Sequence, residues 1–236
     1  MSDAIDPPDA TIEIDGERLS LAVRRHPRAR RYALRIDPAD GRVVLTLPPR
    51  GSLAGGLRFA RRHAVWARRR LAQVPPRIEF EAGTRLVVLG VAVVVVHDQN
   101  HRGPAALEPD ALRVGGRAEF LARRVRDGLK AEARRVLAAR ASERAAALGR
   151  TLASVAIGDP RSRWGSCAPN GALRFSWRLV LAPPPVLDYV VAHEVAHLLE
   201  ANHGPGFWRV VDRLTPHRRE AQAWLRRHGA ALLRMG

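Results

Sequence analysis

His193-Glu194-Val195-Ala196-His197 carries the strongest signal in this 236-residue sequence. Each residue of an α-helix advances by about 100°, so side chains at positions i and i+4 project from nearly the same side. His193 and His197 can therefore hold one Zn²⁺ between their imidazoles. Glu194 would lie beside them, where it can take a proton from a metal-bound water. The stretch predicts a metal site on one helix.

The residues around this stretch favour a buried helix rather than a solvated polar face. The flanking apolar side chains are Leu187, Tyr189, Val190, Val191, Val195, Ala196, Leu198 and Leu199. Burying two imidazoles and a carboxylate without partners would cost on the order of several kcal/mol. A bound cation removes that cost, and this supports the metal site.

His203 is the expected third ligand. In a continuous helix it would lie about 240° around the axis from His197 and point away from the metal. Gly204-Pro205-Gly206 prevents the helix from continuing, and Asn202 can adopt the left-handed conformation at a helix end. We therefore expect the chain to turn back and return His203 to the metal.

Two carboxylates are alternative ligands. Glu200 shares the helix face of His193 but lies about 10 Å further along the axis, too far for one ion on a straight helix. It is a better acceptor for an imidazole N–H. Glu220 lies downstream, where some zincins have a carboxylate ligand, and it stays an alternative to His203.

The composition indicates a soluble, arginine-rich protein. The formal net charge is +17, and Lys130 is the only lysine. This charge could serve nucleic acid, anionic lipid or acidic substrates, or reflect a general preference for arginine. Cys167 is the only cysteine, which excludes an intrachain disulfide and a cysteine-based zinc site. The acidic N-terminus is unlike a signal peptide, and the longest apolar run, 86–96, is too short to cross a bilayer. We expect a cytoplasmic protein with no membrane partner.

The order of predicted elements indicates an α+β fold, with a β-rich N-terminal part followed by a helix-dominated metal domain. We expect a disordered tail at 1–10, the β-rich part with one helix at 11–115, and the catalytic domain at 116–236. The predicted strands are 11–14, 18–25, 31–36, 42–47, 85–89, 91–97, 111–114, 154–158 and 172–181. The predicted helices are 53–74, 118–148, one beginning at the prolines 183–185, 205–213 and 218–227.

Four segments together resemble the YgjP-like metallopeptidase domain, a family similar to the SprT-like and minigluzincin zincins. They are Arg161-Ser-Arg-Trp-Gly-Ser-Cys167, Phe175-Ser-Trp-Arg-Leu179, Val191-Ala-His-Glu-Val-Ala-His197 and Asn202-His-Gly-Pro-Gly-Phe-Trp208. The resemblance extends from about residue 20 and is most specific in the last part of the chain. Family members often have Asn where this chain has Ser176, whose hydroxyl could replace the hydrogen bond of the amide.

The resemblance implies that the helix-dominated metal domain is zincin-like. It also implies Zn²⁺ as the cofactor, with His193, His197 and His203 as its ligands and Glu194 as the catalytic acid/base. Together with the motif it predicts a zinc-dependent hydrolase, a metallopeptidase that acts on a protein or peptide through metal-activated water. One alternative is a metal-dependent nucleotide (UTP) pyrophosphatase, as some family members are described. Another is a nucleic-acid-tethered protease or adaptor.

Three arginines near the motif are candidate substrate-binding residues. Arg161, Arg163 and Arg178 flank the tryptophan-containing segments that precede the metal-site helix. The planar guanidinium suits a substrate carboxylate or phosphate. The same side chains could instead pair with carboxylates of the protein, and the sequence leaves both roles open.

Overall fold

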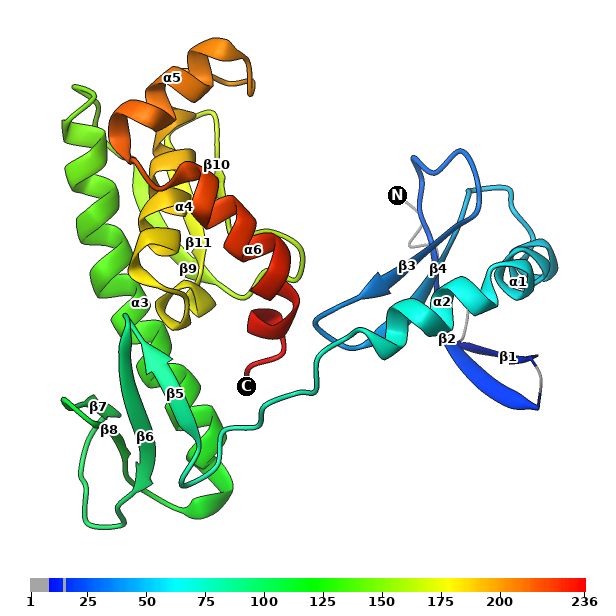
Figure 1. Cartoon of the computed structure of the whole chain (residues 1–236), viewed down its shortest axis with the longest axis horizontal. Helices are drawn as coiled ribbons and strands as arrows, with labels where there is room; N and C mark the ends of the chain where they lie inside the picture. The colour runs from blue at the N-terminus through cyan, green and yellow to red at the C-terminus, as the bar shows by residue number, and fades with distance from the viewer. Residues whose placement is uncertain (1–8, 15) are drawn as a thin grey trace. The chain divides into compact units, whose positions relative to one another are not determined.

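The computed structural model of the chain describes residues 9–14 and 16–236, and it divides into two compact units at Pro76. Most of the tail expected at 1–10 lies outside the described residues. Figure 1 traces the elements of both units. The fold is α+β with a β-rich N-terminal region, as predicted.

The first unit is a four-stranded sheet with two helices. Its elements are β1 (Ala10–Ile14), β2 (Glu17–Arg25), β3 (Ala33–Asp37), β4 (Arg42–Leu47), α1 (Leu53–Arg62) and α2 (Ala64–Ala72). The strand order is β1-β2-β4-β3, with β2 parallel to β4 and both outer pairs antiparallel. Alternate residues of β2, Leu19, Leu21 and Val23, are buried in the unit's own core. Such alternation is typical of a sheet with one covered face.

The single helix expected at 53–74 is two helices. His63 adopts φ −108° and ψ 12°, which is outside the helical region, and it separates α1 from α2. Its ring packs against Phe59 with centroids 4.5 Å apart. Neither glycine nor proline marks this break, so residue types alone did not reveal it.

The second unit contains two small sheets and four α-helices among the described residues. The first sheet has β5 (Arg85–Val88), β6 (Val91–His97), β7 (Ala106–Leu107) and β8 (Ala111–Val114) in the order β5-β6-β8-β7. The second has β9 (Ser154–Gly158), β10 (Gly165–Cys167) and β11 (Ala172–Ser176) in the order β10-β11-β9. The helices are α3 (Leu121–Ala146), α4 (Pro184–Ala196), α5 (Pro205–Leu214) and α6 (Arg218–Leu233).

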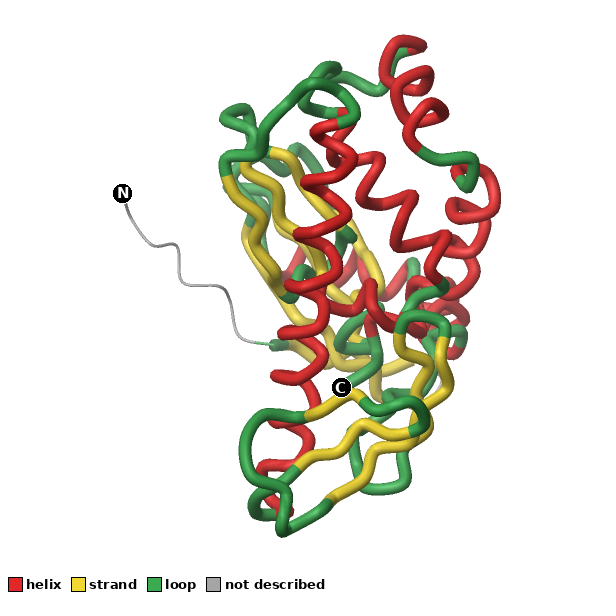
Figure 2. Tube along the Cα trace, turned by 90° about the vertical axis from the view of Figure 1, so that its left-hand side faces the viewer, coloured by secondary structure: helices red, strands yellow, loops and turns green. Residues whose placement is uncertain are grey.

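The four-stranded sheet β5–β8 belongs to this second unit, whereas the expected boundary lay between 115 and 116. Leu86, Val93 and Leu112 share one core with Val125 and Leu129 of α3. In Figures 1 and 2 the sheet lies at the N-terminal end of α3. The apolar strands cover that end of the long helix, so the compact division falls at the proline pair before them.

The strand expected at 172–181 ends at Ser176, and residues Trp177–Leu181 form a 3₁₀-helix instead. The Ser176 side chain is fully buried, and its Oγ accepts a hydrogen bond from the backbone N–H of Arg178 at 3.3 Å. A serine hydroxyl commonly caps a helical turn in this way. The Ser176 hydroxyl thus makes a local hydrogen bond to the backbone at the start of the 3₁₀-helix.

Helix α4 is the centre of the second unit and is buried around nearly its whole circumference. Residues 186–192 and 194–196 are buried, and the helix packs against α3, α5, α6 and β10. Proline at its first positions is compatible with a helix start because those N–H groups have no partner in the helix. Within the described residues, no helix combines the length and apolarity needed to span a bilayer.

A buried carboxylate joins α4 to two neighbouring segments. Asp188 is 6% exposed, and its side chain accepts hydrogen bonds from Arg144 of α3 at 2.8 Å and from Thr215 Oγ1 at 2.6 Å. Thr215 is buried and follows α5 directly. These hydrogen bonds fix the position of α4 relative to α3 and α5.

We therefore expect Asp188→Ala to lower the free energy of unfolding by about 2–4 kcal/mol, because Arg144 and Thr215 lose a buried acceptor. Asp127→Ala is the matched control, since Asp127 pairs with Arg123 on the exposed face of α3. Its effect should stay below about 0.5–1 kcal/mol. Urea unfolding followed by near-ultraviolet circular dichroism measures both changes, and equal effects would contradict a role for this network.

Candidate metal centre

Helix α4 places His193 and Glu194 in its last turn, and His197 is the residue at which the helix ends. The rings of His193 and His197 lie on one side, with centroids 5.3 Å apart. The predicted i, i+4 pair is therefore present, although it spans the end of the helix rather than its interior.

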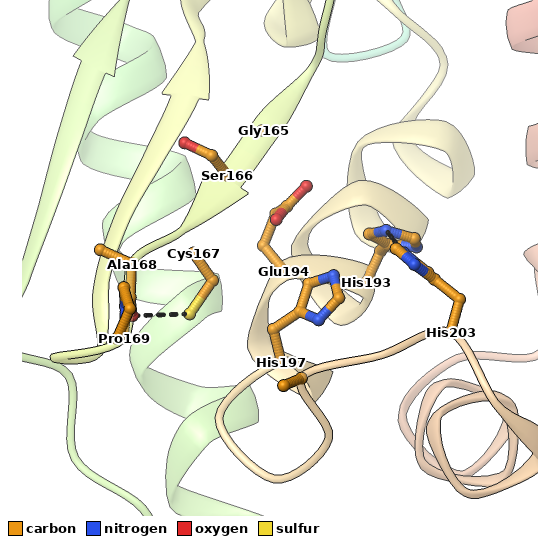
Figure 3. A pocket seen from close by; sticks show the side chains of 10 residues that line it. Gly165, Ser166, Cys167, Ala168, Pro169, His193, Glu194, His197 and His203 are labelled. Carbon is orange, nitrogen blue, oxygen red and sulfur yellow. Dashed lines mark hydrogen bonds between the residues drawn. The ribbon is translucent and has the colours of Figure 1, made fainter.

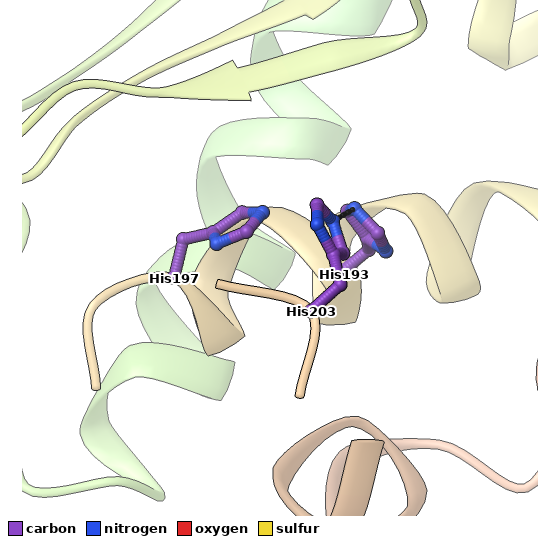
Figure 4. A group of neighbouring side chains, drawn as sticks. All are labelled: His193, His197 and His203. Carbon is purple, nitrogen blue, oxygen red and sulfur yellow. Dashed lines mark hydrogen bonds between the residues drawn. The ribbon is translucent and has the colours of Figure 1, made fainter. Parts of the chain in front are cut away.

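The chain reverses after His197 and returns His203 to the pair. The Nε2 atoms of His203 and His193 are 3.0 Å apart, and one ligand nitrogen from each of the three histidines lies within 4.8 Å of the others. Figure 4 shows the three imidazoles facing one another. Asn202 does not supply a left-handed turn, because Leu89 is the only non-glycine residue with positive φ among the described residues. The reversal instead uses successive turns between 197 and 204.

Hydrogen bonds orient two of the imidazoles. The Nδ1 of His197 is 3.0 Å from the backbone carbonyl oxygen of Glu200, which can accept only an N–H. The Nδ1 therefore carries the proton, and Nε2 keeps the lone pair that a metal requires. The expectation that Glu200 accepts an imidazole proton is thus met by its backbone and not by its carboxylate. The Nδ1 of His193 lies 3.4 Å from the hydroxyl oxygen of Tyr189. That hydroxyl oxygen accepts a hydrogen bond from the side-chain amide of Gln222 at 3.0 Å.

Phe207, the third residue of α5, forms the apolar support beneath the histidines. It is fully buried, and its ring centroid lies 4.9, 4.6 and 4.5 Å from those of His193, His197 and His203. Aromatic packing of this kind restricts ring rotation and therefore holds the nitrogens in place. This residue lies inside a motif of the sequence, but its function there could be recognised only from the packing.

The ligand nitrogens of His193 and His203 have the spacing of a tetrahedral zinc site, and the widest separation among the three histidines, up to 4.8 Å, would shorten around an ion. Zn–N bonds of about 2.0–2.1 Å place tetrahedral ligand nitrogens about 3.3 Å apart. The 3.0 Å separation between His193 and His203 is within a few tenths of an ångström of that spacing. Burial lowers the pKa of His193 to about 4, with further contributions from His197 and His203, and it also lowers the pKa of His197. Both rings are therefore neutral near pH 7 and can act as ligands.

Glu194 lies beside the imidazoles and faces the strand β10 (Figure 3). Only 7% of it is exposed, and burial raises the pKa of its carboxyl to about 7, against a smaller lowering by Arg163. A carboxyl with a pKa near the ambient pH can both accept and return a proton. The arrangement supplies an acid/base group next to a candidate metal site.

An open pocket of about 490 Å³ joins the histidines to β10. It is lined by Gly165, Ser166, Cys167, Ala168, Pro169, His193, Glu194, His197, Ala201 and His203. Burial raises the pKa of the Cys167 thiol, with a smaller contribution from Glu194, so the thiol is neutral near pH 7. The Cys167 side chain is half-buried at the pocket wall.

Gly165 allows β10 to approach Glu194 closely. A Cβ at this position would lie 2.5 Å from Cγ of Glu194 and 2.8 Å from its Cδ, nearer than real contacts permit. The absence of a side chain thus fixes the distance between the strand and the carboxylate. This contact joins residues far apart in the sequence, and no local pattern indicates it.

The three candidate arginines occupy different environments. Arg161 and Arg163 are exposed in the loop before β10, and the positive charge of Arg163 acts on Glu194. Arg178 is buried, pairs with Asp159, and donates from Nε to the carbonyl oxygen of Met235 at 3.2 Å. Its guanidinium also lies 4.4 Å from the ring centre of Trp177. The contacts of Arg178 are structural, and the described pocket lining includes none of the three.

The alternative carboxylate ligands lie apart from the three imidazoles in the described structure. Glu220 is exposed in the first turn of α6. The Glu200 carboxylate instead approaches Gly206 near the N-terminus of α5, where a Cβ would lie 2.6 Å from its Oε1. Helix N-termini favour negative charge, and Glu200 can stabilise this end of α5.

Comparison with known proteins identifies the class of this chain. The family model described as YgjP-like, metallopeptidase domain, matches residues 30–228. The chain therefore belongs to the YgjP-like family, as its motifs indicate, and it is a metal-dependent hydrolase in the general sense of that family. Comparisons with curated proteins and with solved structures give no match.

We expect Gly165→Ala to lower the free energy of unfolding of the metal-free chain by about 1–3 kcal/mol, because the new methyl group overlaps Glu194. Gly158→Ala is the matched control in the same sheet, since its Cβ would meet Cδ of Arg174 at an ordinary 3.5 Å. Chemical unfolding of both variants measures the difference. An unchanged stability for Gly165→Ala would show that β10 is not held against Glu194.

Proposed function

We propose that this YgjP-like chain is a zinc metallopeptidase of the cytoplasm that hydrolyses an amide bond of a protein or peptide. The observation that carries the proposal is the convergence of three imidazole nitrogens beside a buried carboxylate at one open pocket. Three protein ligands leave a tetrahedral zinc ion one position for water or substrate, which distinguishes a catalytic site from a closed structural one. The single cysteine, which excludes an intrachain disulfide, is consistent with the cytoplasm.

The three histidines would hold the ion from two segments of the chain. His193 and His197 would bind it from the end of α4, and His203 from the returning loop. The backbone carbonyl of Glu200 keeps His197 in the tautomer that offers Nε2. Zinc bound here would lower the pKa of a coordinated water and polarise a substrate carbonyl.

Glu194 would transfer the proton in both halves of the reaction. As a carboxylate it accepts a proton from the attacking water, and it then donates that proton to the nitrogen of the leaving amine. Burial raises the pKa of Glu194 to about 7 in the metal-free protein, and a Zn²⁺ bound beside it would lower that pKa and favour the carboxylate that accepts the first proton. Gly165 supports this role because it leaves the carboxylate room between α4 and β10.

The strand β10 offers a binding mode for a peptide. It pairs with β11 on one side, and no other described strand pairs with its outer edge. Gly165, Ser166 and Cys167 of this strand also line the pocket. An extended peptide could add to this edge through backbone hydrogen bonds, which would place its amide groups beside Glu194.

The pocket favours an amide over a nucleotide phosphoanhydride as the substrate. Hydrolysis of UTP would require cationic groups around the phosphates, and the described pocket lining contains no arginine or lysine. Arg163 acts on the pocket only from the exposed loop before β10. We therefore prefer the peptidase to the pyrophosphatase.

Glu194→Gln should retain about one zinc per chain but lower the rate of peptide hydrolysis by about 10²–10⁴-fold, because the amide cannot accept the proton. Glu220→Gln is the control, since it makes the same change at an exposed position. Metal analysis and cleavage of a fluorescently labelled unfolded protein measure both effects. Full activity in Glu194→Gln would refute the assigned role, and release of pyrophosphate from UTP without peptide cleavage would refute the peptidase.

A further inference from the structure

A second pocket lies in the first unit and has a different chemistry from the metal centre. It measures about 460 Å³ and is lined by Tyr32, Ser52, Gly55, Arg58, Arg61 and Arg62. It forms where the first turns of α1 meet the segment that leads into β3. The three arginines make it strongly cationic.

The arginines share one face of α1. Arg58, Arg61 and Arg62 stand at positions i, i+3 and i+4, which places their side chains next to one another. All three are exposed, and none pairs with a carboxylate of the described residues. Like charges at this spacing destabilise a helix by about 0.2–0.5 kcal/mol for each pair. A bound anion would attract all three guanidinium groups, and this attraction would offset their mutual repulsion in α1.

Arginines of the second unit commonly have partners within the protein. Arg113 pairs with Glu108 at 2.7 Å, Arg135 with Glu132 at 2.5 Å, and Arg218 with Asp212 at 2.6 Å. In α1 and α2, Arg68 alone has a carboxylate partner, Glu17, among the described residues. The abundance of arginine in the whole chain therefore does not account for the unpaired group on α1.

The sequence around the pocket lacks acidic residues. Between Asp40 and Glu79 there is no Asp or Glu, and the arginines there are Arg42, Arg50, Arg58, Arg61, Arg62, Arg68, Arg69, Arg70 and Arg77. Arg28, Arg30 and Arg31, which precede the pocket residue Tyr32, are also exposed. The segment that carries the pocket arginines therefore contains no carboxylate to neutralise them, and a polyanion can supply that negative charge.

The wall of the pocket supplies neutral groups as well as charge. Ser52 caps α1, its Oγ accepting from the N–H of Gly55 at 3.1 Å, and the first turn of α1 has no acidic residue. The Tyr32 hydroxyl donates to the carbonyl of Ser52 at 3.3 Å, which holds the ring against the helix start. Gly55 is needed here, because a Cβ would lie 2.5 Å from the Tyr32 hydroxyl.

We infer that this surface, formed by Arg58, Arg61, Arg62, Ser52 and Tyr32, binds the phosphodiester backbone of a nucleic-acid strand. One guanidinium group can donate two hydrogen bonds to the oxygens of one phosphate. Such contacts give affinity without sequence preference. Trp66 of α2 is 43% exposed and offers a face on which a base can stack. This inference does not rest on the hydrolase proposal, because no residue of the metal centre takes part.

The test compares two triple variants of the full chain. The first replaces Arg58, Arg61 and Arg62 with Gln, and the control replaces Arg117, Arg134 and Arg135, which are exposed in the second unit. Each variant lowers the formal net charge of +17 by three units. Fluorescence anisotropy with a short labelled DNA strand, over about 50–200 mM salt, measures the affinity and its salt dependence.

The pocket variant should bind about tenfold or more weakly, and the slope of log K against log salt should become shallower by about two units. The control should change the affinity by less than about threefold. Equal losses in the two variants, or no binding by the wild-type chain at low salt, would overturn the inference. Displacement of the strand by inorganic tripolyphosphate at an equal phosphate concentration would also overturn it, because the pocket would then hold a small anion.

Glu194→Gln serves as a check that the two sites are separate. It should bind the DNA strand with the wild-type affinity, even though its hydrolytic rate is lost. Weakened binding in Glu194→Gln would contradict the assignment of the strand to α1. A chain that binds DNA but cleaves no peptide would leave this inference intact and remove the peptidase.

Discussion

Helix α4 must bury polar groups in an otherwise apolar core, and the second unit is organised around that requirement. The helix is covered on all sides, yet it carries Asp188, His193 and Glu194. Asp188 is compensated by Arg144 and Thr215 within the protein. Among the described residues, His193 has only the Tyr189 hydroxyl and the His203 ring as hydrogen-bonding neighbours, Glu194 forms no ion pair, and both side chains line the pocket. A cation at this position would compensate the cost of burying them.

The elements around α4 position groups at its C-terminal end rather than only covering it. The loop after His197 returns His203, and α5 places Phe207 beneath all three imidazoles. The strand β10 approaches Glu194 closely because residue 165 is glycine. The pocket is therefore built from a helix, a loop and a sheet edge that pack on one core. Packing of this kind is the support that a preorganised centre requires.

The sequence predicted the local features well. The i, i+4 histidines, the return of His203 just before Gly204-Pro205-Gly206, and most strands and helices follow from periodicity, breakers and spacing over a few residues. The remaining features depend on packing between distant segments. No local pattern could show that Gly165 contacts Glu194, or that β5–β8 cover the end of α3. The 3₁₀-helix after Ser176 was taken for strand because its residues are apolar and buried, and periodicity does not separate the two over so short a run.

X-ray absorption at the zinc edge of the loaded protein tests the metal centre most directly. We predict a shell of three imidazole nitrogens at about 2.0–2.1 Å together with one light ligand from solvent. His203→Ala should reduce the imidazole count to two. A wild-type spectrum with fewer than three imidazoles, or with a sulfur ligand, would contradict the site described for His193, His197 and His203.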